Sequence, residues 1–349
     1  MDNLTHSLTG ALAAKLIETS FPASQNEPNE NRKKFWLLVA SVNLPDIDVA
    51  LGLWGDPIFS IQHHRGLTHS LLFAPLFALL PALLLAKFGK LKNFKTPWFC
   101  AAIGIVLHIF FDVITPFGTQ LFAPFSTARH ARDWMFIIDP FFTGILALAL
   151  LLAKIFAPRR RQFLFGGAIF VVLYLGVESI NHHLADKRFE TALRRAGIAS
   201  TKISALPQPL SVFRWMGLAQ TEDGVEQTFL SLLNDESDLQ FTKYKNASDE
   251  FVAQMLQAPE AKWYLTFARH PWIISERRGE ARVVEMQDLQ FSIAKRLLQT
   301  AGIPIPERRP PFVFRYSVAL NDGSAEIMFN GKPARRQEWK EPAGSAPWR

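Results

Sequence analysis

Long apolar runs are confined to roughly the first 180 residues of this 349-residue chain. Four of them are long and apolar enough to cross a bilayer as helices: residues 70–87, 97–115, 136–157 and 162–180. A fifth run, Phe35 to Trp54, has the length but carries Pro45 and two aspartates in its middle. Because carboxylates and a proline break are costly against lipid, this run predicts a broken or re-entrant helix. We therefore predict an α-helical membrane bundle with about four to six membrane-embedded helices.

The rest of the chain has the short, turn-punctuated runs of a water-soluble domain. Six runs predict strands: 209–219, 226–233, 271–278, 281–288, 312–320 and 324–330. Three predict helices: 186–197, 248–258 and 288–301. The prediction is a smaller soluble domain of α+β or mostly β structure. The chain then divides into a membrane-embedded domain of residues 1–181, a soluble domain of residues 182–335 and a tail of residues 336–349.

Basic residues gather in three short clusters beside the apolar runs: Arg32 to Lys34, Lys87 to Lys95 and Arg159 to Arg161. If all three lie in the cytoplasm, the spans alternate without contradiction, and the C-terminal domain is extracytoplasmic. The net charge of +7 then reflects multi-pass topology, so we expect no nucleic acid as a stable partner. Cys100 is the single cysteine, which excludes an internal disulfide and a cysteine-rich zinc site.

The strongest chemical signal is the pair His108 and Asp112 in the run 97–115. A spacing of four residues places imidazole and carboxylate on one face of an otherwise apolar helix. Ionisable groups at membrane depth are costly without partners, which makes a functional site the first interpretation. The alternative is a structural hydrogen bond between the two side chains that locks two helices together.

Three histidines stand within seven residues just before the run 70–87: His63, His64 and His69. Neutral imidazole is a common ligand of transition metals, and Gly66 would let the backbone turn more than one ring inward. The alternative is an exposed loop at the membrane interface in which Thr68 or Ser70 caps the next helix.

Two carboxylates, Asp46 and Asp48, follow Pro45, which is expected to end a helix. In an extended stretch, residues two apart face the same side, so both carboxylates would reach one ion or a pair of ions. One of them would otherwise hold a neighbouring histidine by a hydrogen bond. A plain turn is the remaining alternative, although membrane depth is an unusual place for two carboxylates in a turn.

Two weaker signals add to the candidate site. His6 lies in the polar start of the chain, where a solvated side chain is the ordinary alternative. Arg65 and Arg129 fall on the same predicted side of the membrane and suit an anionic group such as phosphate, although arginines at membrane borders commonly meet lipid headgroups.

The predicted topology brings these residues toward the same half of the bilayer, which favours a single site. Three or more histidines with two or more carboxylates suit zinc, with manganese or iron as alternatives, better than calcium or magnesium. A bound metal lowers the pKa of a water molecule and creates a nucleophile, which is hydrolytic chemistry.

These residues, in this order, resemble the YdjM-type family of bacterial inner-membrane proteins, which are described as metal-dependent hydrolases. The resemblance covers about residues 1–160 and rests on four short stretches: Asp2 to His6, Pro45 to Asp48, His64 to Ser70, and His108 with Asp112 and Thr115 to Gly118. It implies a multi-pass protein of the bacterial inner membrane and says little about the C-terminal domain.

A more distant similarity, in the order of histidines and aspartates, is to zinc-dependent phospholipase C and P1-type nucleases. These enzymes hold zinc ions in a helical bundle and cleave phosphoesters. Carried over by position, the similarity implies six metal ligands: His6, Asp46, His64, His69, His108 and Asp112. Those enzymes are soluble, which is where this chain departs from them.

Together these features predict a membrane-bound, metal-dependent hydrolase of a phosphoester or lipid-like substrate at the outer face of the inner membrane. Asp46 or Asp48 would serve as ligand or base, Arg65 would hold the phosphate, and membrane lipid would be a partner. Two alternatives stay open. One is an ion- or proton-coupled transporter that uses the same residues as a relay, and the other is a membrane-anchored scaffold whose C-terminal domain does the work.

Overall fold

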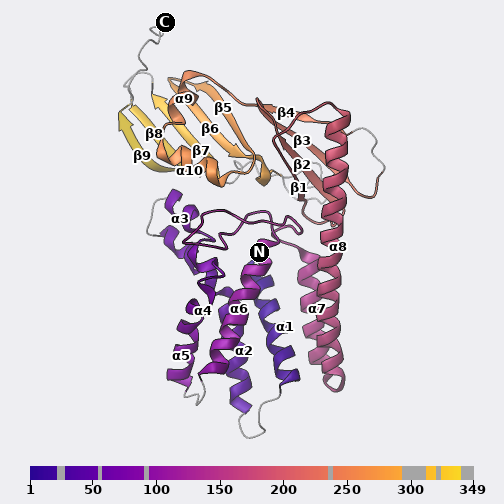
Figure 1. Ribbon diagram of the computed structural model, residues 1–349. Coiled ribbons are helices and arrows are strands. Elements are labelled where there is room, and N and C mark those ends of the chain that lie inside the picture. Colours follow the sequence, from indigo (N-terminus) through magenta and orange to yellow (C-terminus); the bar gives the residue numbers. More distant parts are fainter. Residues whose placement is uncertain are drawn as a thin grey trace. The chain divides into compact units, whose positions relative to one another are not determined.

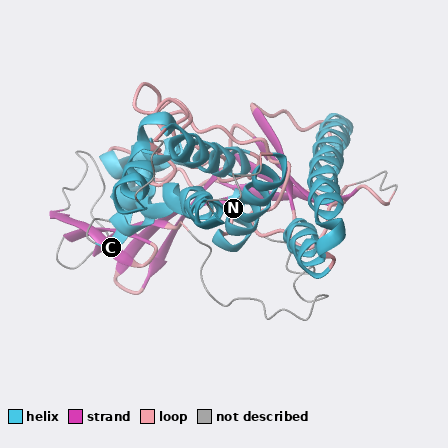
Figure 2. Cartoon of the chain, turned by 90° about the horizontal axis from the view of Figure 1, so that it is seen from below, coloured by secondary structure: helices cyan, strands magenta, loops and turns pink. Residues whose placement is uncertain are grey.

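The computed structural model describes residues 1–21, 28–53, 57–89, 94–234, 239–292, 312–319 and 324–338. The chain forms two compact units. The N-terminal unit comprises Met1–Leu53, His63–His183 and Pro209–Val212, and the C-terminal unit comprises Trp54–Gln62, Leu184–Gln208 and Phe213–Arg349. Figure 2 shows helices in cyan and strands in magenta. The named strands all belong to the C-terminal unit.

The N-terminal unit is built from helices (Figure 1). Its longer helices are α1 (Asn3–Ser20), α2 (Pro28–Asn43), α5 (Leu79–Gly89), α6 (Lys95–Val113) and α7 (Pro140–Ile155). Helix α8 (Arg160–Arg195) begins in this unit, and its residues from Leu184 on belong to the C-terminal unit. Short elements stand between α2 and α5 in the sequence: η1 (Leu44–Leu53), α3 (Pro57–His63), η2 (Leu67–His69) and α4 (Ala74–Phe77). Of these, α3 belongs to the C-terminal unit except for its last residue. A further short element, η3 (Ala157–Arg159), precedes α8.

Two helices of the described chain are long and apolar enough to cross a membrane, Lys95–Val113 and Ala157–Arg195. A third candidate is a bent pair, Ile61–His69 with Ala74–Phe88, whose parts meet at 83°. The chain therefore has a helical N-terminal region with two or three candidate spans. The higher number of four to six membrane-embedded helices stays a prediction.

Two predicted spans differ from the structure for local reasons. The run 70–87 is not one straight helix, because it opens with a turn and Pro75 stands in the first turn of α4. The run 136–157 gives only the 16-residue helix α7, because the Asp139 side chain caps that helix at Pro140. The apolar residues before Asp139 therefore belong to a loop.

The predicted break in the run Phe35 to Trp54 is confirmed, since α2 ends at Asn43 and the 3-10 helix η1 follows. Two glycines let neighbouring helices approach this end of α2 closely. A Cβ on Gly10 of α1 would lie 2.7 Å from Val42 Cγ1, and one on Gly104 of α6 would lie 3.0 Å from the Val42 nitrogen. This close packing sets the last carbonyls of α2 beside α6.

The C-terminal unit contains two antiparallel sheets whose strands follow one another in sequence order (Figure 1). The first sheet consists of β1 (Lys202–Pro207), β2 (Arg214–Gln220), β3 (Gly224–Ser231) and β4 (Thr242–Lys245). The second consists of β5 (Pro271–Arg278), β6 (Ala281–Asp288), β7 (Phe314–Ala319), β8 (Ser324–Phe329) and β9 (Lys332–Glu338). Two short helices, α9 (Glu250–Met255) and α10 (Pro259–Phe267), stand between the sheets in the sequence.

The strand-rich character of the C-terminal domain is confirmed, but several bounds differ. The predicted strand 209–219 begins only at Arg214, and the predicted helix 186–197 is the end of α8. Only the start of the predicted helix 288–301 is described, as the 3-10 turn η4 (Leu289–Phe291); residues 293–301 lie outside the described residues. β9 continues past residue 336, so the predicted tail begins too early.

Candidate functional site

The last two turns of α6 carry His108 and Asp112, and both side chains are fully buried. His108 Nδ1 lies 2.6 Å from the carbonyl oxygen of Val42, at the end of α2. A carbonyl oxygen only accepts hydrogen bonds, so Nδ1 must carry the proton. The neutral ring therefore presents an unprotonated Nε2 on its other side.

A hydroxyl group fixes the same tautomer in His69. Its Nδ1 lies 2.9 Å from Thr68 Oγ1, and this hydroxyl donates to Asp48 Oδ2 at 2.7 Å. Since a hydroxyl has one proton, Thr68 must accept the hydrogen bond from Nδ1. His69 Nε2 is then also unprotonated in the neutral ring.

The two Nε2 atoms face each other at 3.0 Å. Asp112 Oδ2 lies 3.2 Å from His69 Nε2 and 3.3 Å from His108 Nε2. Asp46 Oδ1 lies 3.6 Å and 3.5 Å from the same two atoms. All four ligand atoms lie within 4.8 Å of one another. Ligand atoms around a tetrahedral zinc ion with bonds near 2.05 Å stand roughly 3.3 Å apart, so this spacing suits a small divalent ion.

The second oxygen of Asp112 faces a different group. His6, on α1, is fully buried and stacks on the His108 ring at 3.9 Å. Its Nε2 lies 3.3 Å from Asp112 Oδ1, and neither ring nitrogen makes a hydrogen bond with the described residues. The amino group of Met1 contacts the same oxygen. His6 therefore lies beside the four-residue cluster and is not a member of it.

His64 lies outside that cluster, in a second group with Asp46 and Asp48 whose ligand atoms are also close enough together to hold a metal ion. Its Nδ1 lies 2.8 Å from Asp48 Oδ1. Asp48 Oδ2 accepts hydrogen bonds from the Arg65 backbone at 3.0 Å and from the Thr68 hydroxyl. Asp48 thus contacts His64 and Thr68, and it reaches His69 both through Thr68 and directly, with Oδ2 3.4 Å from His69 Nδ1. The sequence offers both ligand and hydrogen-bond partner as its role, and the described contacts leave both open, since Asp48 makes these hydrogen bonds and also belongs to the second candidate metal group.

The guanidinium of Arg65 is buried against the cluster. Nε lies 3.1 Å from Asp112 Oδ2, and Nη1 donates to Thr115 Oγ1 at 3.2 Å. Its Cζ lies 4.7 Å from the centre of the Phe117 ring, and Cζ of Arg129 lies 5.7 Å from the same ring. Arg129 donates to the His64 carbonyl oxygen at 3.1 Å. Two cations therefore flank one aromatic ring beside His64.

The sequence alone did not predict the contacts that Thr68, Phe117 and the Val42 carbonyl make in the site. Thr68 stands within the histidine-rich stretch and was interpreted as a helix cap. The contribution of Val42 comes from the backbone, so no side-chain motif signals it.

The family comparison matches the region that holds all of these residues. The model of the YdjM inner membrane protein family matches residues 1–185. The chain belongs to the YdjM family. This membership and the apolar helices identify an inner membrane protein.

A curated relative matches part of the chain. The YdjM-family chain is 30% identical over 141 residues to the uncharacterized protein YfhP of Bacillus subtilis (strain 168), a match that covers 40% of the chain and 42% of that protein. No solved structure matches the chain.

Proposed function

We propose that this YdjM-family protein is a membrane-bound, metal-dependent hydrolase whose divalent ion is held by Asp46, His69, His108 and Asp112. The observation that carries the proposal is the convergence of two imidazole lone pairs with two carboxylates. In both rings Nδ1 donates a hydrogen bond to an acceptor. Such a hydrogen bond on the second ring nitrogen is how metal-binding histidines are oriented. A mixed nitrogen and oxygen set of four ligands favours zinc, with manganese or iron as alternatives.

The proposed centre has one accessible side. The side chains of His69, His108 and Asp112 are fully buried, whereas Asp46 is 15% exposed. Substrate would therefore approach past Asp46. A divalent ion in this place supplies Lewis-acid activation of a water molecule or of a phosphoryl oxygen.

His64 is placed to act as the proton acceptor. With Nδ1 donating to Asp48, its Nε2 holds the lone pair, and its side chain is 22% exposed. It shares a group with Asp46, so it lies next to the accessible side of the centre. His64 Nε2 would accept a proton from the attacking water and would then pass that proton to the leaving group or to solvent. Asp48 would position the ring.

The proposed substrate is a phosphoester or a lipid-like ester at the outer face of the inner membrane. Arg65 and Arg129 give the loop beside His64 a positive charge. Guanidinium groups bind phosphate oxygens well, which supports an anionic substrate. Membrane lipid is then both the surroundings of the protein and a candidate source of substrate.

A transporter is the second candidate, because two imidazole nitrogens 3.0 Å apart also suit a shared proton. Assays of the hydrolysis of bis(p-nitrophenyl) phosphate and of dispersed phospholipid distinguish the hydrolase from the transporter. We expect turnover that a chelator abolishes and zinc restores, and that His108→Ala lacks. A metal-loaded protein without turnover on either substrate, but with proton flux in vesicles, would favour the transporter.

A further inference from the structure

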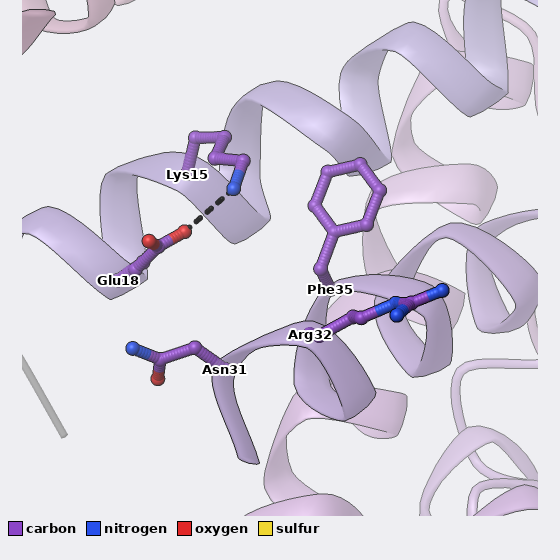
Figure 3. A pocket seen from close by; sticks show the side chains of 5 residues that line it. All are labelled: Lys15, Glu18, Asn31, Arg32 and Phe35. Carbon is purple, nitrogen blue, oxygen red and sulfur yellow. Dashed lines mark hydrogen bonds and ion pairs between the residues drawn. The ribbon is translucent and has the colours of Figure 1, made fainter. Parts of the chain in front are cut away.

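A separate hollow of about 210 Å³ lies in the N-terminal unit, between the end of α1 and the start of α2. Figure 3 shows the five side chains that line it: Lys15, Glu18, Asn31, Arg32 and Phe35. None of them belongs to the histidine and aspartate cluster described above. The hollow therefore needs an explanation of its own.

Two cations contact the carboxylate of Glu18, the one acidic side chain that lines the hollow. Glu18 Oε2 lies 2.8 Å from Lys15 Nζ (Figure 3) and 3.2 Å from Arg160 Nη2. A carboxylate shared by two cations leaves the group with net positive charge, and Arg32 adds another cation to the lining. The net positive charge of these side chains therefore attracts anions to the hollow.

Two basic clusters far apart in the sequence meet at this hollow. Arg32 belongs to the cluster Arg32 to Lys34, and Arg160 belongs to the cluster Arg159 to Arg161. The contact between Arg160 and Glu18 joins segments 142 positions apart. Basic clusters beside membrane helices mark the membrane border, where acidic headgroups lie.

Aromatic side chains accompany these cations. Lys15 Nζ lies 4.9 Å from the centre of the Phe35 ring. Trp36 packs its ring edge-on to Phe35 at 5.1 Å and is 59% exposed. Exposed aromatic rings next to cations are typical of the level of lipid headgroups. The hollow thus has the composition of a membrane border rather than of a soluble ligand pocket.

We propose that this hollow binds the phosphate of an anionic phospholipid headgroup, such as phosphatidylglycerol. Arg32 would supply a forked donor to the phosphate oxygens, and Lys15 a second charge. Phe35 and Trp36 would contact the glycerol and the first part of the acyl chains. The site is independent of the proposed hydrolase function, because it shares no residue with the metal cluster.

The test is a titration of the purified protein in mild detergent with phosphatidylglycerol or phosphatidylcholine, read by the thermal unfolding midpoint. We expect a concentration-dependent rise with phosphatidylglycerol and none with phosphatidylcholine. Arg32→Gln should weaken the apparent affinity by about tenfold, the loss expected for one charged hydrogen-bonded contact. Arg32→Lys should lose less, since it keeps the charge.

The matched control is Lys87→Gln, which removes an equal charge from α5, outside the lining of the hollow. It should keep the full response to phosphatidylglycerol. An equal loss in both variants would overturn the proposal in favour of general charge attraction. No response to phosphatidylglycerol would overturn it directly. The same rise with inorganic phosphate alone would show that the hollow takes free phosphate and not a lipid.

Discussion

His69 and His108 direct their Nε2 atoms at each other across 3.0 Å, although they stand 39 positions apart in the sequence. In each ring the opposite nitrogen is held by an acceptor, so two lone pairs face each other. Such an arrangement is unfavourable unless a positive charge lies between the rings. Asp46 and Asp112 add two carboxylates around the same nitrogens, and Asp112 also contacts Arg65 and the Met1 amino group.

The hydroxyl of Thr68 should tune the metal affinity without touching the ion. Thr68→Val removes the nearer acceptor of His69 Nδ1, leaving Asp48 Oδ2 at 3.4 Å, and takes one donor from Asp48 Oδ2. We expect the apparent metal affinity to fall by about 10- to 100-fold. Competition with a chromogenic chelator measures this. Thr68→Ser is the control and should stay near wild type, and an unchanged affinity in Thr68→Val would remove this hydroxyl from the account.

His64 should affect hydrolysis but not metal content. His64 belongs to the second candidate group and not to the four-residue cluster, so under the proposed ligand set His64→Ala should retain the ion held by that cluster. Loss of the proton acceptor should lower the hydrolysis rate by about 10²- to 10⁴-fold. Asp48→Asn should also lower it, since the ring loses its orienting carboxylate. If His64→Ala comes out of purification without metal, His64 is a ligand and its proposed role is wrong.

Close packing at Gly104 should stabilise the N-terminal unit. Gly104→Ala places a Cβ 3.0 Å from both Ser41 Cβ and the Val42 nitrogen, so α2 and α6 must separate. We expect a loss of about 1–3 kcal/mol and a lower thermal midpoint. Gly144→Ala in α7 is the matched control, because its Cβ would meet nothing within 4 Å. That change should leave the free energy of unfolding equal or raise it by about 0.4–1 kcal/mol, so the midpoint should not fall.

Acid should destabilise the C-terminal unit through His270. Burial, with Arg269 and Lys202 nearby, lowers the pKa of this histidine to about 3. In the unfolded chain it titrates near pH 6.5, so between these values only the unfolded state binds the proton. His270 therefore has no effect on stability above about pH 6.5. Below that pH the free energy of unfolding falls by about 1.4 kcal/mol per pH unit.

The variant His270→Gln isolates this contribution. Its urea midpoint should change less between pH 7 and pH 5 than that of the wild-type protein. Gln can still donate toward Ser204 Oγ, which lies 2.9 Å from His270 Nε2. Identical changes in the two proteins would mean that His270 is not the group responsible.

Local spacing was enough to predict part of the site. The four-residue interval between His108 and Asp112 fixes them on one face of α6, and Pro45 marks the end of α2. The sequence could not show which histidines join the four-residue cluster, because this depends on contacts between distant segments. Nothing in the sequence tells that His69 faces His108 while His64 turns to Asp48.

The missed strands have similar explanations. β1 buries four consecutive residues and ends in Pro207, so it lacks the alternating pattern of a half-buried strand. β4 has only four residues, none of them buried. The start of α7 was predicted too early, because apolar residues continue into the loop before its Asp139 cap. In each case a tertiary or capping interaction decides a boundary that periodicity leaves open.

The most direct test of the metal site is elemental analysis of protein purified in mild detergent without a metal-affinity tag. His108→Ala is compared with Cys100→Ala, which changes another buried residue of α6 outside the cluster. The account predicts near-stoichiometric zinc, manganese or iron in the wild-type and Cys100→Ala proteins and its loss from a folded His108→Ala protein. Wild-type protein that binds none of these metals, even after they are added back, would contradict it.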